Sequence, residues 1–502
     1  METASSGGSK WANATLTKEI AENINLIKTI FKNDGTLVTR MIESMSVPTI
    51  RYCIINSDGM VNNKLINEDI IKPLLEYRPE KKEPDLIDII AKQVTLSNSV
   101  EKATELEKII QGIIYGDTVL FVDGYAEALI LNTKGWSMRS TVEPENEKVL
   151  RGPREGFTEA LLMNLSMIRR RIRTPELKME YQTFGTRTKT QACICYMEGL
   201  VNQDVLDELK KRLNSFTIDG TLDVNYINEF IRDAPYSPIK TIGSTERPDV
   251  VAAKLLEGRV ALLLDGTPVA MTVPHLFIEH FQSDEDYYIN FYFSSIGRIL
   301  RLIAFFISTS TPAIYVALTT FHQEMLPTSL VMSISLARQG VPFPTVVEAV
   351  LMLIVFEMLR ESGARMPGMM GQALSIVGAL VIGQAAVTAK IVSAPMIIVV
   401  ALTGICGLMV PRIKGASIVI RFLLLGLSSI LGLYGYMFGM IALMIHLLTT
   451  NSFGIPIMSS VFTDGFQGRK DIMIRAPWWK MLKRPKYLSQ NITRVSIKDD
   501  NK

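Results

Sequence analysis

The sequence predicts a chain in two parts: an α/β soluble tandem of two similar subdomains, followed by an all-α polytopic membrane domain. The first observation is the distribution of charge. Of 53 basic and 50 acidic side chains in 502 residues, only 13 fall between Ile296 and Val461. The second is a mean hydropathy of +0.21, which is high for a soluble protein of this length. The third is a set of residues that recurs after about 140 positions. Together these exclude a wholly soluble globule, a disordered chain and a secreted disulfide scaffold.

The domain boundaries follow from the composition along the chain. Residues 1–17 are rich in Ser, Gly, Asn and Thr and predict a disordered lead. This lead has no apolar segment typical of a signal peptide, so we expect the soluble part to stay in the cytoplasm. The α/β subdomains are expected at 18–148 and 149–290, the membrane domain at 291–461, and a basic cytoplasmic tail at 462–502.

The soluble part contains an internal repeat. Helical spacing of apolar residues predicts helices at Lys18–Lys32 and Asn202–Asn214, and buried strands are expected at Thr118–Val122 and Val260–Leu264. Five residues of the first strand–turn–strand unit recur 142 positions later; they are Gly116, Leu120, Asp123, Gly124 and Ala128, matched by Gly258, Leu262, Asp265, Gly266 and Ala270. A second set, beginning at Cys53, recurs 140 positions later, at Cys193. Two segments with nearly the same offset predict duplicated subdomains, and chance matching of Gly-rich turns is the alternative.

The junction between the two copies is a polar, Gly-rich segment, Val149–Phe157. Its charged residues Arg151, Arg154 and Glu155 precede a predicted helix, Thr158–Arg173, with a strongly basic end. We interpret these three residues as candidates for binding an anion or a neighbouring subunit at the helix start. The alternative is a solvated linker, followed by cations that favour the helix C-terminus.

Uncharged stretches locate the membrane spans, since about 20 helical residues cross the hydrocarbon core. Three such stretches are Leu302–Gln323, Met366–Ala389 and Ile391–Pro411. Phe422–Thr463 is long enough for a two-span hairpin that turns near Tyr434–Gly439. A shorter candidate, Pro344–Leu359, completes about six spans, within a range of four to six. Leu326–Arg338 is expected to be an interfacial or re-entrant helix.

The basic residues support an even number of spans with both termini inside. With six spans, seven basic residues fall in the inner loops, namely Arg298, Arg301, Arg360, Arg365, Arg412, Lys414 and Arg421. Only Arg338 and Lys390 fall in the outer loops. This asymmetry obeys the positive-inside rule.

Two acidic and three small residues are candidates for an ion pathway. Glu348 and Glu357 lie in an apolar span, where carboxylates are costly and usually functional. They are nine residues apart, which places them on opposite faces of a helix. Glu357 can pair with Arg360, whereas Glu348 has no basic partner at helical spacing. Ser375, Gly378 and Gly383 belong to a small-residue span that predicts either close helix packing or a pore wall.

No enzymatic chemistry is indicated. The sequence has no GxSxG, HExxH or Walker motif, and we expect no catalytic residue, no metal site and no cofactor. His275 and His280 have no ligand partners at metal-binding spacing and are expected to be surface or core residues. The net charge of +3, without a basic stripe interleaved with aromatic residues, gives no support for nucleic-acid binding.

Several motifs resemble the A subunit of GerA-type spore germinant receptors. The resemblance covers about residues 20–490 in order. It is carried by GPREGF at Gly152–Phe157 and by the segments Thr311–Ala317, His322–Pro327, Gly340–Pro344, Phe356–Pro367, Ser375–Ala389 and Ile391–Pro395. A related sporulation protein, the stage V AF type, shares this architecture, and the sequence does not separate the two.

The resemblance implies a multi-pass protein of the inner membrane of a bacterial spore, in contact with membrane lipid. It implies a homo-oligomer, a pentamer, that forms a ligand-gated channel for monovalent cations. It also implies two partners, an integral-membrane B subunit and a lipoprotein C subunit. Two other functions stay open from the residues themselves. They are a secondary transporter, which would need a substrate site at broken helices, and a membrane-anchored scaffold subunit of the germination complex.

Overall fold

The computed structural model describes residues 15–44, 50–78, 86–135, 144, 147–149, 151–365, 381–459, 468–489, 491 and 493–494. The chain divides into two compact units. The first comprises Met1–Arg232, Ile242–Pro274 and Lys483–Lys502, and the second comprises Asp233–Thr241 and His275–Leu482. Most of the predicted disordered lead, residues 1–14, lies outside the described residues. Leu16 is buried in the apolar core of the first unit, so the lead does not extend to residue 17.

The first half of the first unit is a five-stranded antiparallel sheet between helices. The sheet order is β1-β2-β4-β5-β3. Helices α1 and α5 cover one face, and the helical segments between β2 and β3 cover the other. The elements are α1 (Ile20–Ile30), β1 (Leu37–Glu43), β2 (Arg51–Ser57), α2 (Asn63–Leu65), η1 (Ile66–Ile71), α3 (Lys72–Glu76), α4 (Leu86–Ile89), η2 (Ile90–Val94), β3 (Val100–Ala103), α5 (Leu106–Tyr115), β4 (Thr118–Val122) and β5 (Ala128–Leu131).

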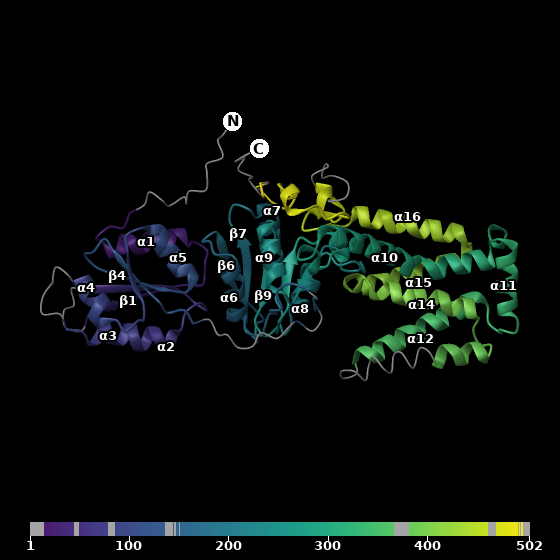
Figure 1. The fold of residues 1–502 in the computed structure, drawn as a ribbon, viewed down its shortest axis with the longest axis horizontal. Helices are drawn as coiled ribbons and strands as arrows, with labels where there is room; N and C mark the ends of the chain where they lie inside the picture. Colours follow the sequence, from purple (N-terminus) through teal and green to yellow (C-terminus); the bar gives the residue numbers. More distant parts are fainter. Residues whose placement is uncertain are drawn as a thin grey trace, which may run out of the picture. The chain divides into compact units, whose positions relative to one another are not determined.

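The second half repeats this architecture, as the sequence offsets predicted. Its sheet order, β6-β7-β9-β10-β8, is the order of the first sheet, strand for strand, and its neighbouring strands are also antiparallel. Figure 1 shows both sheets with their helices. The elements are α6 (Leu161–Arg171), β6 (Leu177–Phe184), β7 (Thr190–Met197), α7 (Gln203–Leu213), α8 (Val224–Ile231), β8 (Gly243–Thr245), α9 (Pro248–Leu256), β9 (Val260–Leu264) and β10 (Ala270–Val273).

Polar contacts repeat along with the strands. Asn23 in α1 donates its side-chain amide to a backbone carbonyl just before that helix, and Asn164 in α6 does the same. Asp123 accepts the first N–H of α1 at 3.4 Å, and Asp265 accepts the first N–H of α6 at 3.0 Å. Each half therefore fixes its first helix to its Asp-Gly turn by the same contact. This agreement favours duplication over chance matching of turns.

Buried polar contacts join the two halves within the first unit. Asp34 and Arg169 form an ion pair at 2.5 Å, and their side chains are 1% and 3% exposed. Lys178 of β6 donates its ammonium group to the carbonyl of Ile30 at the end of α1, at 3.0 Å. Buried charges are costly unless they are paired, so these contacts hold the halves in one arrangement.

The second unit is mostly helical. Two of its helical stretches, Phe291–Thr320 and Pro411–Leu431, are long and apolar enough to cross a membrane. Figure 1 shows α10, α14, α15 and α16; α10 packs against the other three, and α15 also packs against α14 and α16. The elements are η3 (Phe277–Phe281), η4 (Asp284–Tyr287), α10 (Phe291–Thr320), η5 (Gln323–Met325), α11 (Thr328–Arg338), α12 (Thr345–Arg365), α14 (Ala394–Leu408), η6 (Pro411–Ile413), α15 (Lys414–Leu431), α16 (Leu433–Thr449), β11 (Asn451–Ser452), β12 (Ile455–Pro456), η7 (Gly468–Asp471) and η8 (Trp478–Lys480).

The predicted turn of the last hairpin was misplaced. Helix α15 ends at Leu431 and α16 begins at Leu433, so the chain turns at Gly432 and not within Tyr434–Gly439. Gly432 has φ +60°, a conformation that favours glycine. A Cβ atom at this position would also lie 2.7 Å from the ring of His322. The uncharged stretch in the sequence predicted where the hairpin lies. Which of its glycines forms the turn depends on backbone geometry, which the sequence pattern did not show.

Candidate functional site

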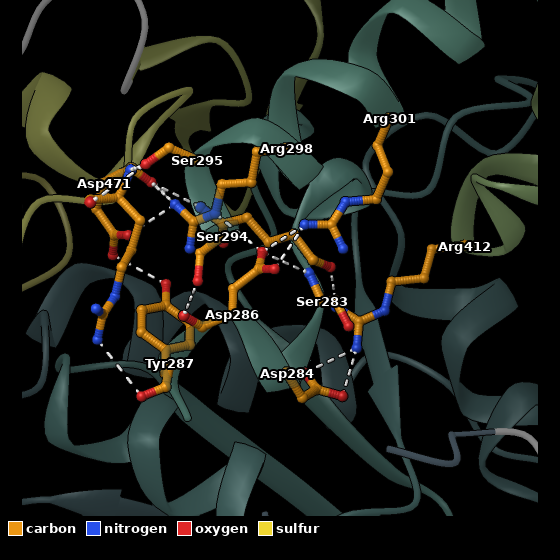
Figure 2. Close-up of polar contacts among 12 residues, drawn as sticks. Ser283, Asp284, Asp286, Tyr287, Ser294, Ser295, Arg298, Arg301, Arg412 and Asp471 are labelled. Atoms are coloured by element: carbon orange, nitrogen blue, oxygen red, sulfur yellow. Dashed lines mark hydrogen bonds and ion pairs between the residues drawn. The ribbon is translucent and has the colours of Figure 1, made fainter. Parts of the chain in front are cut away.

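The first turns of α10 carry two arginines that meet one buried aspartate. Arg298 Nε lies 3.0 Å from Asp286 Oδ2, and the terminal guanidinium nitrogen Nη2 of Arg301 lies 2.6 Å from the same oxygen. Asp286 belongs to η4 and is 2% exposed. It also accepts the backbone N–H of Ser283 at 3.1 Å. Figure 2 shows these side chains converging at the start of α10.

A segment near the C-terminus completes the other side of this arrangement. Arg298 Nη1 donates to Asp471 Oδ1 at 2.8 Å and to the carbonyl of Asp471 at 2.9 Å. The Tyr287 hydroxyl donates to the second carboxylate oxygen of Asp471 at 2.9 Å. The guanidinium group of Arg298 lies 5.3 Å from the centre of the Tyr287 ring, within range of a cation–π contact. Asp471 is thereby fixed to the start of α10.

Arg412, in the short helix η6 just before α15, joins the same region. Arg412 Nη2 donates to both carboxylate oxygens of Asp284, at 2.8 and 2.7 Å, and Arg412 Nη1 donates to the carbonyl of Gln282 at 2.9 Å. We call Asp284, Asp286, Arg298, Arg301, Arg412 and Asp471 the α10-start network. It ties three distant segments together, the start of α10, the start of α15 and residues 468–471. From the sequence, these arginines were predicted only to be loop charges, and their spacing gave no signal of their aspartate partners.

Glu348 joins α12 to the start of α14. Its side chain is fully buried, and one carboxylate oxygen accepts the backbone N–H and the hydroxyl of Ser393, the N-cap residue of α14. A carboxylate at a helix N-terminus is favoured by the helix dipole. The other oxygen, Oε2, lies 3.9 Å from Arg338 Nε and accepts no hydrogen bond within the described part of the chain.

Glu357 lies between two arginines on another face of α12. It pairs with Arg360, as its spacing predicted, and its Oε1 lies 3.1 Å from Arg421 Nη1. The placement of Arg421 in an inner loop was wrong. Arg421 lies inside α15, and its side chain is 1% exposed. The spans were predicted from uncharged stretches, so each arginine was taken to end a span. A buried counter-ion, here Glu357, instead allows Arg421 to lie within a helix.

The small-residue candidates are described only in part. Ser375 and Gly378 lie outside the described residues. Gly383 is buried within residues 381–388, which are helical. A Cβ atom on Gly383 would lie 3.8 Å from the side chain of Ile397 in α14. Gly383 therefore packs against α14, which agrees with the helix-packing alternative; its role in a pore stays a prediction.

The junction between the α/β halves is held firmly by Arg247. This side chain is fully buried and donates to the carbonyl of Pro153 at 2.8 Å. Glu155 pairs with Arg171 at 2.6 Å. Arg151 and Arg154 are exposed, and neither forms a hydrogen bond or ion pair in the part of the chain that the structure describes. The backbone of the segment is thus held in place, while the side chains of Arg151 and Arg154 are exposed.

The two histidines belong to the core. His275 and His280 are both buried, with ring centres 4.8 Å apart, and His275 Nδ1 lies 3.1 Å from Glu279 Oε2. Burial, together with the neighbouring His275, holds the pKa of His280 well below its ordinary value. Among the described residues, no group of three or more His, Cys, Asp or Glu side chains is arranged to hold a metal ion.

Residues 25–487 match the Bacillus/Clostridium GerA spore germination protein family. Spore germination protein KA of Bacillus subtilis (strain 168) is 42% identical over 477 residues, covering 95% of this chain and 88% of that protein. A second protein of this strain, the uncharacterized membrane protein YfkQ, is 45% identical over 437 residues, covering 86% of this chain and 84% of YfkQ. Among solved structures, the chain is similar to the crystal structure of the N-terminal domain of the A subunit of the Bacillus megaterium spore germinant receptor GerK3. The two sequences are 31% identical, and the match covers 53% of this chain and 98% of the GerK3 domain, with a TM-score of 0.43.

Proposed function

The chain belongs to the GerA family of spore germination proteins, and we propose that it is the A subunit of a spore nutrient germinant receptor. In this proposal, copies of the chain form a pentameric, ligand-gated channel in the inner spore membrane. The channel releases monovalent cations at the start of germination and performs no enzymatic step. An integral-membrane B subunit and a lipoprotein C subunit complete the receptor.

The observation that carries the channel proposal is Glu348. It is a carboxylate buried in an apolar helical unit, and its Oε2 accepts no hydrogen bond among the described residues. Its cationic neighbour Arg338 is 3.9 Å away and donates no hydrogen bond to it. A buried carboxylate oxygen without a hydrogen-bond donor is costly, and such groups in membrane helices commonly mark ion pathways. A ring of these carboxylates in a symmetric oligomer would offset the dehydration of a passing cation.

The basic residues support a multi-pass arrangement with both termini on the spore-core side. Arg421 is left out because it is buried inside α15. Six basic residues then remain at or near the helix ends that a six-span arrangement places inside, and two remain at the ends placed outside. The inner ones are Arg298 and Arg301 in the first turns of α10, Arg360 and Arg365 in the last turns of α12, and Arg412 and Lys414 at the start of α15. The positive-inside asymmetry therefore persists. It agrees with an α/β tandem that stays on the core side.

The junction segment supports assembly into a ring. Arg151 and Arg154 project from a backbone that Arg247 holds in place. A patch of this kind that meets a different patch on the next copy makes a head-to-tail contact, and such contacts form a ring when the rotation between copies closes. We propose that these two arginines lie in that contact.

The proposed function is tested in spores of the source organism, from which the gene for this chain is deleted and then restored. Wild-type spores should release potassium when given a mixture of amino acids, sugars and nucleosides, and spores with the deletion should lose release toward at least one nutrient. Loss toward a single nutrient indicates a specific receptor, whereas slower release toward all of them indicates an accessory channel of the stage V AF type. Unchanged release toward every nutrient would contradict a role in germinant response.

A further inference from the structure

Helix α10 contains a proline in its buried middle. Pro312 has no backbone N–H, so the carbonyl four residues earlier, on Ser308, loses its helical donor. Both Ser308 and Pro312 are buried. An unsatisfied carbonyl in such a position is costly and calls for another donor.

Arg421 supplies that donor from another helix. Its Nε donates to the Ser308 carbonyl at 2.7 Å. The guanidinium group lies beside Gly407 of α14, where a Cβ atom would be 3.7 Å from Arg421 Nη2. Because the Arg421 side chain is 1% exposed, water cannot readily replace it as the donor.

The same guanidinium group is tied to α12 on its other side. Arg421 Nη1 lies 3.1 Å from Glu357 Oε1, and Glu357 also pairs with Arg360. One side chain of α15 therefore joins the freed carbonyl of α10 to a carboxylate of α12. Glu357 has two cationic neighbours, which makes it their counter-ion rather than a site for a free cation.

We propose that Arg421 is a positioning residue of the channel, which replaces the donor that Pro312 removes and thereby makes α10, α12 and α15 move together during gating. The gating role rests on the proposed channel function, whereas the structural tie does not. Arginine suits this position because its fork of donors reaches two acceptors at once.

The test is a double-mutant cycle between Arg421 and Pro312 in the full-length chain, assembled with its partner subunits. In Arg421→Gln, amide hydrogen exchange in the middle of α10 should become about tenfold faster. Pro312→Ala returns a backbone donor to Ser308, so the double variant should recover exchange to within about twofold of Pro312→Ala alone. Pro395→Ala is the matched control, because Pro395 lies in the first turn of α14, where a proline frees no carbonyl.

The same variants in spores test the gating role. Arg421→Gln should slow nutrient-triggered potassium release at normal protein level, Pro312→Ala should restore it, and Pro395→Ala should not. The proposal is overturned if Pro312→Ala gives no recovery of exchange. It is also overturned if exchange recovers while Arg421→Gln spores release potassium at the wild-type rate. Failure of the receptor function itself is distinguishable, since wild-type and deletion spores would then behave alike.

Discussion

His280 shows how burial fixes the charge state of a single residue. The ring lies in the core beside His275, and Lys240 and Arg412 also disfavour a positive charge there, while Glu279 partly offsets them. A histidine in this environment stays neutral in the folded chain. The unfolded chain, in contrast, exposes an ordinary imidazole, which takes up a proton near pH 6.5.

The pKa of His280 predicts a loss of stability in acid. Because the folded pKa is depressed, the unfolded state binds the proton first as pH falls, so the stabilisation is complete above about pH 6.5 and is lost below it. The expected loss approaches about 1.4 kcal/mol per pH unit until the folded pKa is reached. Thermal unfolding of the detergent-solubilised chain between pH 5.5 and 7.5 measures it.

His280→Phe should remove this dependence, since a neutral ring replaces the imidazole. His322→Gln serves as the control, because His322 is only partly buried and lies in a different part of the helical unit. An equal pH dependence in His280→Phe and in the wild type would assign the effect to other groups.

At the scale of elements, residue pattern predicted what depends on local periodicity. The strands Thr118–Val122 and Val260–Leu264 have the predicted bounds, because each is a short apolar run that ends at an Asp-Gly turn. The predicted helix Asn202–Asn214 is α7, capped by the side chain of Asn202. These features need only neighbouring residues, so a sequence is sufficient to find them.

Contacts between distant residues could not be predicted in the same way. Arg298 and Asp471 are 173 positions apart, and neither lies in a sequence motif that indicates the other as its partner. Arg421 was misplaced because a charge in an apolar stretch was taken as a loop. The signal available in the sequence was Pro312, whose freed carbonyl requires a donor from elsewhere. It does not say which helix provides that donor.

If the exposed arginines of the junction segment contact a neighbouring copy, reversing the charge of one of them should weaken assembly. Arg154→Glu should reduce the oligomer on native gels while the chain remains folded, because an exposed charge that contacts a neighbouring copy would be reversed. Arg187→Glu is the matched control, since Arg187 is 84% exposed in the same half and pairs with Asp219 only at 3.6 Å. Equal oligomer in both variants would leave the segment without an assembly role.

At the scale of the whole molecule, the chain combines a duplicated α/β tandem with a helical unit that contains paired buried charges. The duplication was readable because both copies kept the turn residues that their topology requires. The sequence predicted that the helical unit is apolar. It did not predict how the helices pack, because that depends on the long-range contacts of the α10-start network and of Arg421. The proposed function rests on the family and on the buried carboxylate of Glu348, which this order positions.

Single-channel recording is the direct test of the proposal that assembled copies of this chain conduct monovalent cations. The complete receptor, reconstituted in a planar bilayer with a KCl gradient, should show discrete openings upon addition of its nutrient. Their reversal potential should lie near the potassium equilibrium potential. Glu348→Gln should lower cation selectivity or conductance, since it removes the negative charge that the proposal places along the ion path. Absence of discrete openings, or a reversal potential near that of chloride, would show that the assembled receptor is not a cation channel.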